Sequence, residues 1–144
     1  MNIWRNLRTI EDLNASREGT LIANLGILFT EIGADFVRGT MPVDTRTAQP
    51  YGLLHGGASV ALAETLGSMG AAMCVDAEYQ VVGQEINANH VRAARDGLVT
   101  GTARAVHLGG RTHVWTIDIV NEAQKLVCIS RITMAVIKRG ALTP

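Results

Sequence analysis

A single carboxylate, Glu64, stands alone in a long run of small and apolar residues. Residues 56–75 contain no other charged side chain, and no lysine or arginine lies between Thr47 and Val91. If this run is helical, Glu64 has no basic partner three or four residues away to neutralise it. A carboxylate of this kind is either a general base or nucleophile facing a cleft, or an incidental acid on the surface.

A second chemical feature lies just ahead, where His55-Gly56-Gly57 leads into the same run. The first N–H groups of a helix have no partner within the helix and carry partial positive charge. Glycine lets a ligand atom come close to these groups. The helix start could therefore stabilise a carbonyl oxygen that becomes an oxyanion, although a glycine-rich helix start without a function is also common.

The spacing of these two features predicts a site shared by two chains. Gly56 and Glu64 are eight residues apart, which corresponds to about 12 Å along a helix axis. Both groups would have to lie within about 3 Å of one reacting carbonyl, and one straight helix cannot easily supply both. Two antiparallel helices can, because the start of one lies beside the middle of the other. We therefore predict a two-fold dimer with its sites at the interface.

The helix that would hold these groups is predicted over residues 57–73. Its glycine, alanine and serine residues are small enough to let another backbone come close: Gly57, Ala58, Ser59, Ala61, Ala63, Gly67, Ser68, Gly70, Ala71 and Ala72. Each glycine costs about 1 kcal/mol in a helix interior, so close packing must compensate. We expect a central helix wrapped by a sheet and buried on nearly all sides.

The remaining elements are predicted from apolar, β-branched runs and the turns between them. Strands are expected at 25–32 and 35–43 before the long helix, and at 85–93, 98–107, 112–120 and 126–137 after it. A short helix is expected within 9–18. Short turns between the last four runs, including Arg95-Asp96-Gly97, predict consecutive antiparallel hairpins. The element order indicates an α+β fold with one antiparallel sheet curled around one helix.

Composition and charge limit the class of protein. A chain of 144 residues favours one domain, and 47% hydrophobic against 18% charged residues leaves apolar surface for contact between subunits. Thirteen basic and thirteen acidic residues cancel, without a basic block, so no nucleic-acid or membrane partner is expected. Cys74 and Cys128 are interpreted as reduced core thiols. The N-terminal residues do not resemble a signal peptide, and we expect a cytoplasmic protein.

Three stretches together resemble a known family: QPYGLLHGGASVALAETLGS (49–68), VVGQEINANHVRAAR (81–95) and HLGGRTHVWTIDI (107–119). In this order they are similar to the hot-dog-fold acyl-CoA thioesterases. The second and third stretches narrow the likeness to the branch of bacterial 1,4-dihydroxy-2-naphthoyl-CoA hydrolases and enterobactin-pathway proofreading thioesterases. The resemblance covers residues 3–137 and implies one hot-dog thioesterase domain over 1–144, with a tail at 138–144. Met69 and Met73 depart from the pattern, which leaves the substrate open.

The resemblance implies a role for each residue of the helix and its entrance. Glu64 would be the catalytic carboxylate, acting on the thioester or on water, and Ser68 would help to hold the attacking water. The backbone N–H of Gly56 would bind the thioester carbonyl, which His55 and Gln49 would orient. In this family Glu64 and Ser68 come from one chain, and the Gln49–Gly56 group comes from its neighbour.

The resemblance also implies a path for the nucleotide and pantetheine of coenzyme A. The residues along it are Gly83, then His90, Val91, Arg92 and Ala93, then the turn of His107, Leu108, Gly109, Gly110, Arg111 and Thr112. Turn amides and arginines are suitable ligands for phosphate groups. The alternative is that the arginines are solvated charges at the sheet edge. His113, beyond this turn, is interpreted as a structural histidine with its hydrogen bonds satisfied.

The leading hypothesis for function is hydrolysis of an acyl-CoA or acyl-carrier-protein thioester that carries an aromatic or medium-length acyl group. No metal or cofactor is expected, because the four histidines lack metal-ligand spacing and coenzyme A is part of the substrate. Expected partners are an acyl or aryl carrier protein and copies of the chain itself, in a homodimer at least and a homotetramer by resemblance. Two alternatives stay open: a hot-dog acyl-CoA hydratase or dehydratase, and a non-catalytic acyl-CoA-binding module.

Overall fold

The computed structural model of the protein describes residues 1–141. Two short helices, α1 (Ile10–Ala15) and α2 (Leu21–Asn24), precede two strands, β1 (Leu28–Ile32) and β2 (Phe36–Pro42). The long helix α3 (Gly56–Met73) follows, and then four strands, β3 (Tyr79–His90), β4 (Leu98–Leu108), β5 (Thr112–Val120) and β6 (Leu126–Lys138). Of the predicted tail, residue 138 ends β6 and residues 142–144 lie outside the described residues. No helix within residues 1–141 has the length and apolar character needed to cross a membrane.

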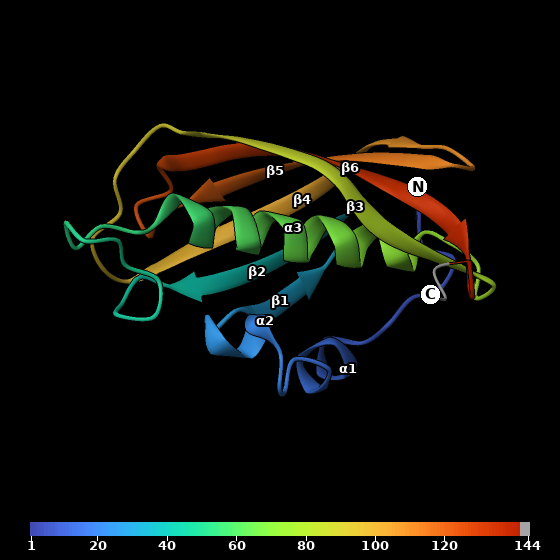
Figure 1. Ribbon diagram of the computed structural model, residues 1–144, viewed down its shortest axis with the longest axis horizontal. Helices are drawn as coiled ribbons and strands as arrows, with labels where there is room; N and C mark the ends of the chain where they lie inside the picture. Colours follow the sequence, from blue (N-terminus) through green and yellow to red (C-terminus); the bar gives the residue numbers. More distant parts are fainter. Residues whose placement is uncertain (142–144) are drawn as a thin grey trace.

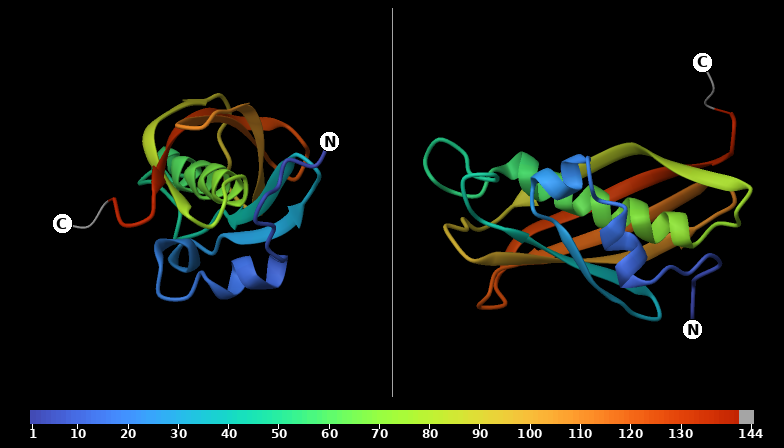
Figure 2. Two further views of the ribbon diagram at one scale, coloured as in Figure 1. Left: turned by 90° about the vertical axis from the view of Figure 1, so that its right-hand side faces the viewer. Right: turned by 90° about the horizontal axis from the view of Figure 1, so that it is seen from below.

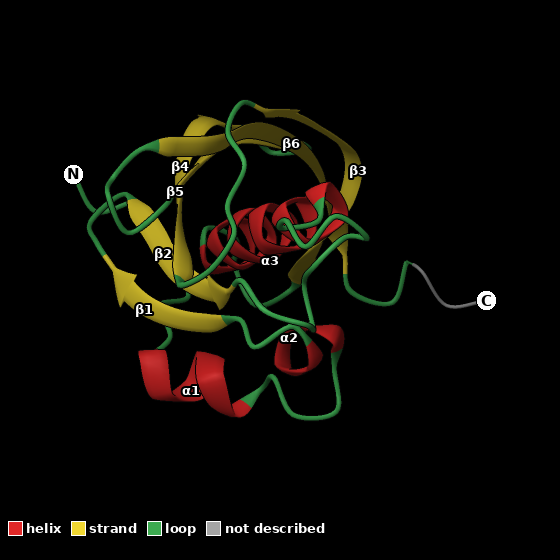
Figure 3. Ribbon diagram, turned by 90° about the vertical axis from the view of Figure 1, so that its left-hand side faces the viewer, coloured by secondary structure: helices red, strands yellow, loops and turns green. Residues whose placement is uncertain are grey.

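The six strands form one antiparallel sheet that curls around α3 (Figures 1 and 2). Their order across the sheet is β1-β2-β4-β5-β6-β3, with β1 and β3 at the two edges. Helices α1 and α2 lie outside the sheet, next to β1 (Figure 3). The predicted α+β fold class, the hot-dog arrangement of one antiparallel sheet around a long central helix, is confirmed.

One predicted hairpin was wrong, because β3 does not pair with β4. Strand β3 pairs with β6 along its length, from Tyr79 opposite Lys138 to His90 opposite Cys128. The chain then passes around the start of α3 to reach β4 (Figure 1). On this path the N–H of Leu54 donates to the carbonyl of Ala94 at 2.8 Å. The segment between β3 and β4 contains Arg95-Asp96-Gly97, which is also typical of a hairpin turn. The local sequence pattern therefore does not distinguish a crossover from a hairpin.

Other boundaries also differ from the prediction. Strand β3 begins at Tyr79 rather than residue 85, and the region 9–18 holds only the six residues of α1, followed by the unpredicted helix α2. Helix α1 starts at a capping box: Thr9 accepts the N–H of Asp12, and the Asp12 carboxylate accepts the N–H of Thr9. The cap fixes where α1 begins.

The small residues of α3 permit close packing on the concave face of the sheet. A Cβ atom built on Gly70 would lie 2.7 Å from the ring of Trp115, and one on Gly67 would lie 2.7 Å from the Ile132 side chain. Trp115 is fully buried and stacks on Trp4, with ring centroids 6.3 Å apart. Larger side chains at these glycines would push α3 off the sheet. The prediction that close packing accounts for the glycines is therefore confirmed.

One face of α3 is left uncovered in the single chain. The residues on it are Gly57, Val60, Ala61, Glu64, Thr65, Ser68, Met69 and Ala72, which are exposed or half-buried. They recur every three or four positions and so form one stripe along the helix. We call this the open stripe. The expectation that α3 is buried on nearly all sides is therefore wrong for one chain, because the sheet covers only the opposite face.

Candidate active site

The start of α3 presents one backbone amide without a partner. His55 is the N-cap residue, and its Nδ1 accepts the N–H of Gly57 at 2.8 Å. The N–H groups of Ala58 and Ser59 both donate to the carbonyl of His55. The N–H of Gly56 makes no hydrogen bond to any residue in the described range 1–141. This amide points out of the positive end of the helix and can bind a carbonyl oxygen.

The cap also fixes the proton on the His55 ring. A nitrogen that accepts a hydrogen bond carries no proton, so the neutral ring has its proton on Nε2. His55 is exposed, and its Nε2–H is a further donor at the helix start. It does not line the cleft described next.

Gln49 supplies a donor from the turn that precedes α3. The N–H of Gly52 donates to the Gln49 carbonyl at 2.9 Å, and the Gln49 N–H donates to the carbonyl of Leu53 at 2.8 Å. Its side-chain Oε1 accepts the N–H of Tyr51. The oxygen is thereby held toward the turn. The Nε2 amide group has no partner within residues 1–141 and stays available to a ligand.

Gln49 and Gly56 meet in one cleft of about 370 Å³ at the start of α3. The other residues that line it are Leu53, Leu54, Ser59, His90, Val91, Arg92, Ala93 and Val127. A Cβ atom on Gly56 would lie 2.8 Å from Nε2 of His90, so the imidazole covers the helix start closely. The chain thus brings two predicted carbonyl-binding residues together with the predicted coenzyme-A-binding stretch at 90–93. We call this the amide cleft.

Glu64 lies outside the amide cleft, on the open stripe of the same helix. Its carboxylate makes no hydrogen bond or ion pair with any described residue. It rests against the edge strand β3, where a Cβ atom on Gly83 would lie 2.6 Å from Oε1 of Glu64. The register of β3 with β6 shifts between Gly83 and Glu85, which marks a bulge at this position.

Ser68 stands one helical turn beyond Glu64. Its hydroxyl donates to Sδ of Met134 at 3.7 Å, and Met134 is the residue of β6 that pairs with Gly83. Glu64, Ser68 and Gly83 therefore gather at one place, where α3 meets β3 and β6. The role of Ser68 in holding a water molecule stays a prediction. The contact with Met134 uses only the hydroxyl proton, so the hydroxyl oxygen can still accept a hydrogen bond.

The turn from His107 to Thr112 lies at the other end of α3. Leu108, Gly109 and Gly110 border a second cavity together with residues 74–76, which follow the helix. The 18 residues of α3 separate this turn from the amide cleft by about 27 Å. A single chain therefore does not bring the two predicted coenzyme-A-binding stretches, 90–93 and 107–112, to one place.

The arginines near these stretches are all exposed. Nε of Arg92 donates to the carbonyl of Leu126 at 3.3 Å, beside the amide cleft. Arg95 and Arg111 have no side-chain partner within residues 1–141. Their positions are compatible both with binding phosphate groups and with the alternative of solvated edge charges.

His113 was missed as a residue of interest. It is buried, as predicted, but its Nδ1 has no hydrogen-bond partner within residues 1–141, so the expectation of a satisfied structural histidine is wrong. Burial lowers the pKa of His113, the nearby His107 lowers it further, and a backbone hydrogen bond with Gly109 acts in the opposite direction. The unpaired nitrogen depends on packing across the sheet, and no sequence signal reveals it.

Within residues 1–141, no three side chains of histidine, cysteine, aspartate or glutamate are grouped so that they could hold a metal ion. The expectation that the reaction needs no metal or cofactor remains a prediction.

Comparison with known proteins identifies relatives along nearly the whole chain. Residues 51–128 match the Thioesterase superfamily. The chain is 53% identical over 135 residues to 1,4-dihydroxy-2-naphthoyl-CoA hydrolase of Escherichia coli K12, which covers 94% of this chain and 99% of that protein. It is 48% identical over 135 residues to proofreading thioesterase EntH of Cronobacter sakazakii, with 94% and 98% covered.

A solved structure gives the same result in three dimensions. The crystal structure of thioesterase HI1161 from Haemophilus influenzae superposes with a TM-score of 0.95 and 45% sequence identity, and 99% of each chain is covered. The sequence resemblance and the fold are thereby confirmed together.

Proposed function

The chain belongs to the Thioesterase superfamily, and from this membership we propose that it hydrolyses acyl-CoA thioesters to a free acid and a free thiol. The observation that supports this proposal is the amide cleft, where two unpartnered donors, the Gly56 N–H and the Gln49 amide, face one cavity. A lone carboxylate, Glu64, lies on the open stripe of the same helix.

The thioester carbonyl would be polarised by the amide cleft. Its oxygen accepts hydrogen bonds from the Gly56 N–H and from Nε2 of Gln49. His55, which lies at the helix start outside the cleft lining, would help to orient the substrate through its Nε2–H. Charge that develops on this oxygen is stabilised by donors already in place, each of which contributes about 3 kcal/mol to the transition state. The positive end of α3 acts in the same direction.

Glu64 would attack the carbonyl or activate water for attack. As a general base it takes a proton from water while the water oxygen bonds to the carbonyl carbon, and Ser68 helps to hold that water. The C–S bond then breaks, and the thiolate receives the proton. As a nucleophile Glu64 bonds to the carbonyl carbon and the C–S bond breaks, which releases the thiolate and leaves an acyl–carboxylate anhydride that water then hydrolyses.

A second copy of the chain would bring these groups together. Gly56 and Glu64 lie about 12 Å apart along the helix axis, too far to act on one carbonyl. The open stripe is apolar apart from Glu64, Thr65 and Ser68, and its small residues would allow an antiparallel copy of α3 to pack on it. In that dimer Glu64 and Ser68 of one chain face Gln49 and Gly56 of the other.

Coenzyme A would enter along β3 and the amide cleft. Gly83 and the stretch of His90, Val91, Arg92 and Ala93 border its path. The turn of His107, Leu108, Gly109, Gly110, Arg111 and Thr112 lies about 27 Å away in the same chain, so it would contact the nucleotide only from a further subunit. In the antiparallel dimer proposed above, the far end of the partner's helix approaches this cleft, so the partner subunit can supply the turn. We propose a homotetramer built from two such dimers.

The acyl group is proposed to be aromatic or of medium length. One relative is named for an aromatic substrate, 1,4-dihydroxy-2-naphthoyl-CoA, and another is a proofreading thioesterase.

An acyl or aryl carrier protein is a second proposed acyl donor. We further propose that residues 1–144 act as one thioesterase domain, without metal or cofactor, in the cytoplasm.

A panel of acyl-CoA thioesters with detection of the released thiol tests this function. We expect thiol release from aromatic and medium-length substrates, with the aromatic ones ranked highest. Tight binding of every ester without thiol release would indicate a binding module. Hydration of an enoyl-CoA without thiol release would indicate a hydratase.

The chemical route is tested by a single turnover in water enriched in heavy oxygen. Label found in Glu64 by peptide mass spectrometry would support the anhydride route, because water that attacks the Glu64 carbon of the anhydride leaves its oxygen in that side chain. If Glu64 is a general base, the label appears in the acid product and not in the enzyme.

A further inference from the structure

The two edges of the sheet differ in how their backbone groups are satisfied. An edge strand directs the N–H and C=O groups of alternate residues away from its neighbour, where a strand of another molecule can bind them. At β1 these are the groups of Phe29 and of Ile27, which comes just before the strand. All four groups have partners within residues 14–22. The first half of the β1 edge is therefore closed.

Asn14 of α1 closes the edge at Phe29 in the manner of a strand. Its Nδ2 group donates to the Phe29 carbonyl at 2.9 Å, and its Oδ1 accepts the Phe29 N–H at 2.9 Å. A side-chain amide offers N–H donors and a C=O acceptor, as a peptide backbone does, so it can replace the backbone of a neighbouring strand. Asn14 thus occupies the place that a further strand would take.

Arg17 and Ile22 close the same edge at Ile27. Nη1 of Arg17 donates to the Ile27 carbonyl at 2.9 Å, and the Ile27 N–H donates to the Ile22 carbonyl at 3.0 Å. Nε of Arg17 also donates to the carbonyl of Asn14 at 3.1 Å. One guanidinium group therefore links the end of α1 to the edge of the sheet.

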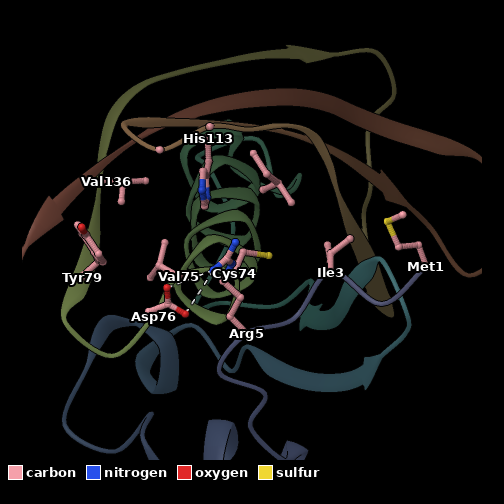
Figure 4. Close-up of a pocket in the computed structure, with 12 residues that line it drawn as sticks. Met1, Ile3, Arg5, Cys74, Val75, Asp76, Tyr79, His113 and Val136 are labelled. Carbon is pink, nitrogen blue, oxygen red and sulfur yellow. Dashed lines mark hydrogen bonds and ion pairs between the residues drawn. The ribbon is translucent and has the colours of Figure 1, made fainter.

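The N-terminal part of the chain that carries these groups is fixed to the rest of the fold. Leu13 of α1 is fully buried in the core. Earlier in the chain, the N–H groups of Arg5 and Asn6 donate to the carbonyl of Met73 at 2.9 and 3.0 Å. Arg5 also forms an ion pair with Asp76 at 3.2 Å (Figure 4). These contacts hold α1 against the sheet.

The opposite edge of the sheet, β3, has no such cover. From Gln80 to Asn89 its backbone makes no hydrogen bond within residues 1–141 beyond those with β6. This edge lies beside Glu64 and the open stripe, where the proposed dimer forms. A sheet with one free edge can pair with one copy only, whereas two free edges would let copies add without end.

We propose that residues 9–22 act as an edge cover, which prevents β1 from pairing with β1 of a second copy and so keeps the assembly of the chain finite. The sequence of residues 27–32, ILFTEI, is apolar and β-branched apart from one charge, which favours pairing with an identical strand. Neither Glu64 nor the amide cleft belongs to the edge cover. Its loss should therefore change assembly without removing a group that is proposed for hydrolysis.

Asn14→Ala in the full chain tests the edge cover, because it removes both bonds to Phe29 and keeps a good helix former in α1. We expect the weight-average mass in sedimentation experiments to rise at least about twofold with protein concentration, since copies then join through β1. Asn24→Ala is the matched control: Asn24 is exposed at the end of α2, and its side chain has no partner within residues 1–141. This variant should have the mass of the unaltered protein at every concentration.

Hydrogen exchange locates the association. In Asn14→Ala the Phe29 amide loses its acceptor, so at low concentration it should exchange about tenfold faster than in the unaltered protein. At high concentration it should become slow again, because a second copy pairs with β1.

Two further variants complete the test. Thr30 is exposed on β1, and adding Thr30→Lys to Asn14→Ala places a charge on the opened edge, which should restore the mass of the unaltered protein. If Asn14→Ala does not fold, Arg17→Met serves instead. It removes the bond to the Ile27 carbonyl while Asn14 stays, and it should raise the mass in the same way.

Three results would overturn the proposal. The first is an unchanged mass of Asn14→Ala at every concentration. The second is an equal rise in mass in Asn24→Ala. The third is a rise that Thr30→Lys does not reverse, or that leaves the Phe29 amide fast at high concentration, since the association would then lie elsewhere on the molecule. Mass and exchange are measured without substrate, so a failure of the proposed hydrolysis would not affect this test.

Discussion

A side chain at position 83 would collide with Glu64, because a Cβ atom on Gly83 would lie only 2.6 Å from Oε1 of that carboxylate. The two residues come from different elements, the long helix α3 and the edge strand β3. Gly83 therefore makes room for the carboxylate where the strand bulges. Ser68 lies at the same place, where its hydroxyl contacts Met134.

Gly83→Ala is predicted to displace the Glu64 carboxylate and to lower kcat about tenfold to a hundredfold, since shifts near 1 Å have effects of that size. Thermal unfolding should change little, because Glu64 is exposed and can move. Gln80→Ala is the control on the same strand, because Gln80 belongs neither to the proposed catalytic group nor to the proposed coenzyme A path. Equal activity of the two variants would show that Gly83 does not position Glu64.

Glu64→Gln is predicted to lower kcat by about 10²–10³-fold, as the loss of a general base or nucleophile implies. Binding of a non-hydrolysable acyl-CoA analogue should change far less. Glu18→Gln makes the same chemical change at an exposed residue without a partner in the described part of the chain and should be neutral. Activity of Glu64→Gln within tenfold of the unaltered protein would remove Glu64 from the mechanism.

Mixing two inactive variants is predicted to restore activity if the site is shared between chains. A hybrid dimer of Glu64→Gln and Gln49→Ala has one site with both changes and one site with neither. After unfolding and refolding an equal mixture, we expect about a quarter of the unaltered activity. Each variant refolded alone is the control. No recovery in the mixture, despite hybrid dimers seen by native mass spectrometry, would place Glu64 and Gln49 of one chain in the same site.

His55→Ala is predicted to destabilise the protein by about 1 kcal/mol, because the N-cap bond to the Gly57 N–H is lost. His55→Asn should keep most of that stability, since asparagine is a good N-cap residue. Urea unfolding measures both. Activity separates the second role of His55: if its Nε2–H orients the substrate, His55→Asn stays impaired in kcat although its stability is restored.

Cys74 is predicted to react slowly with thiol reagents in the folded protein. Its pKa is raised by burial from 9.0 to about 11, so at pH 8 the thiolate fraction falls about a hundredfold. Labelling should accelerate as pH rises toward 11, and it should be fast at pH 8 after unfolding in urea. Fast labelling of Cys74 at pH 8 in the folded protein, followed by peptide mass spectrometry, would contradict its buried placement.

Much of the architecture follows from local pattern. The run of small residues with one charge located α3 to within one residue at its start, and β-branched runs located β5 and β6 nearly to their ends. Helix starts and alternating strands depend on neighbours within a few positions, so sequence determines them well. The quoted stretches determined the family, and the eight-residue spacing of Gly56 and Glu64 predicted a shared site.

Only the tertiary structure decided how distant segments meet. It placed β3 beside β6 rather than β4, left one face of α3 open with Glu64 on it, and set the turn at 107–112 far from the cleft at 90–93. It also left Nδ1 of His113 without a partner. These features depend on contacts between residues far apart in the chain, and such contacts leave no periodic signal in the sequence around any one of them.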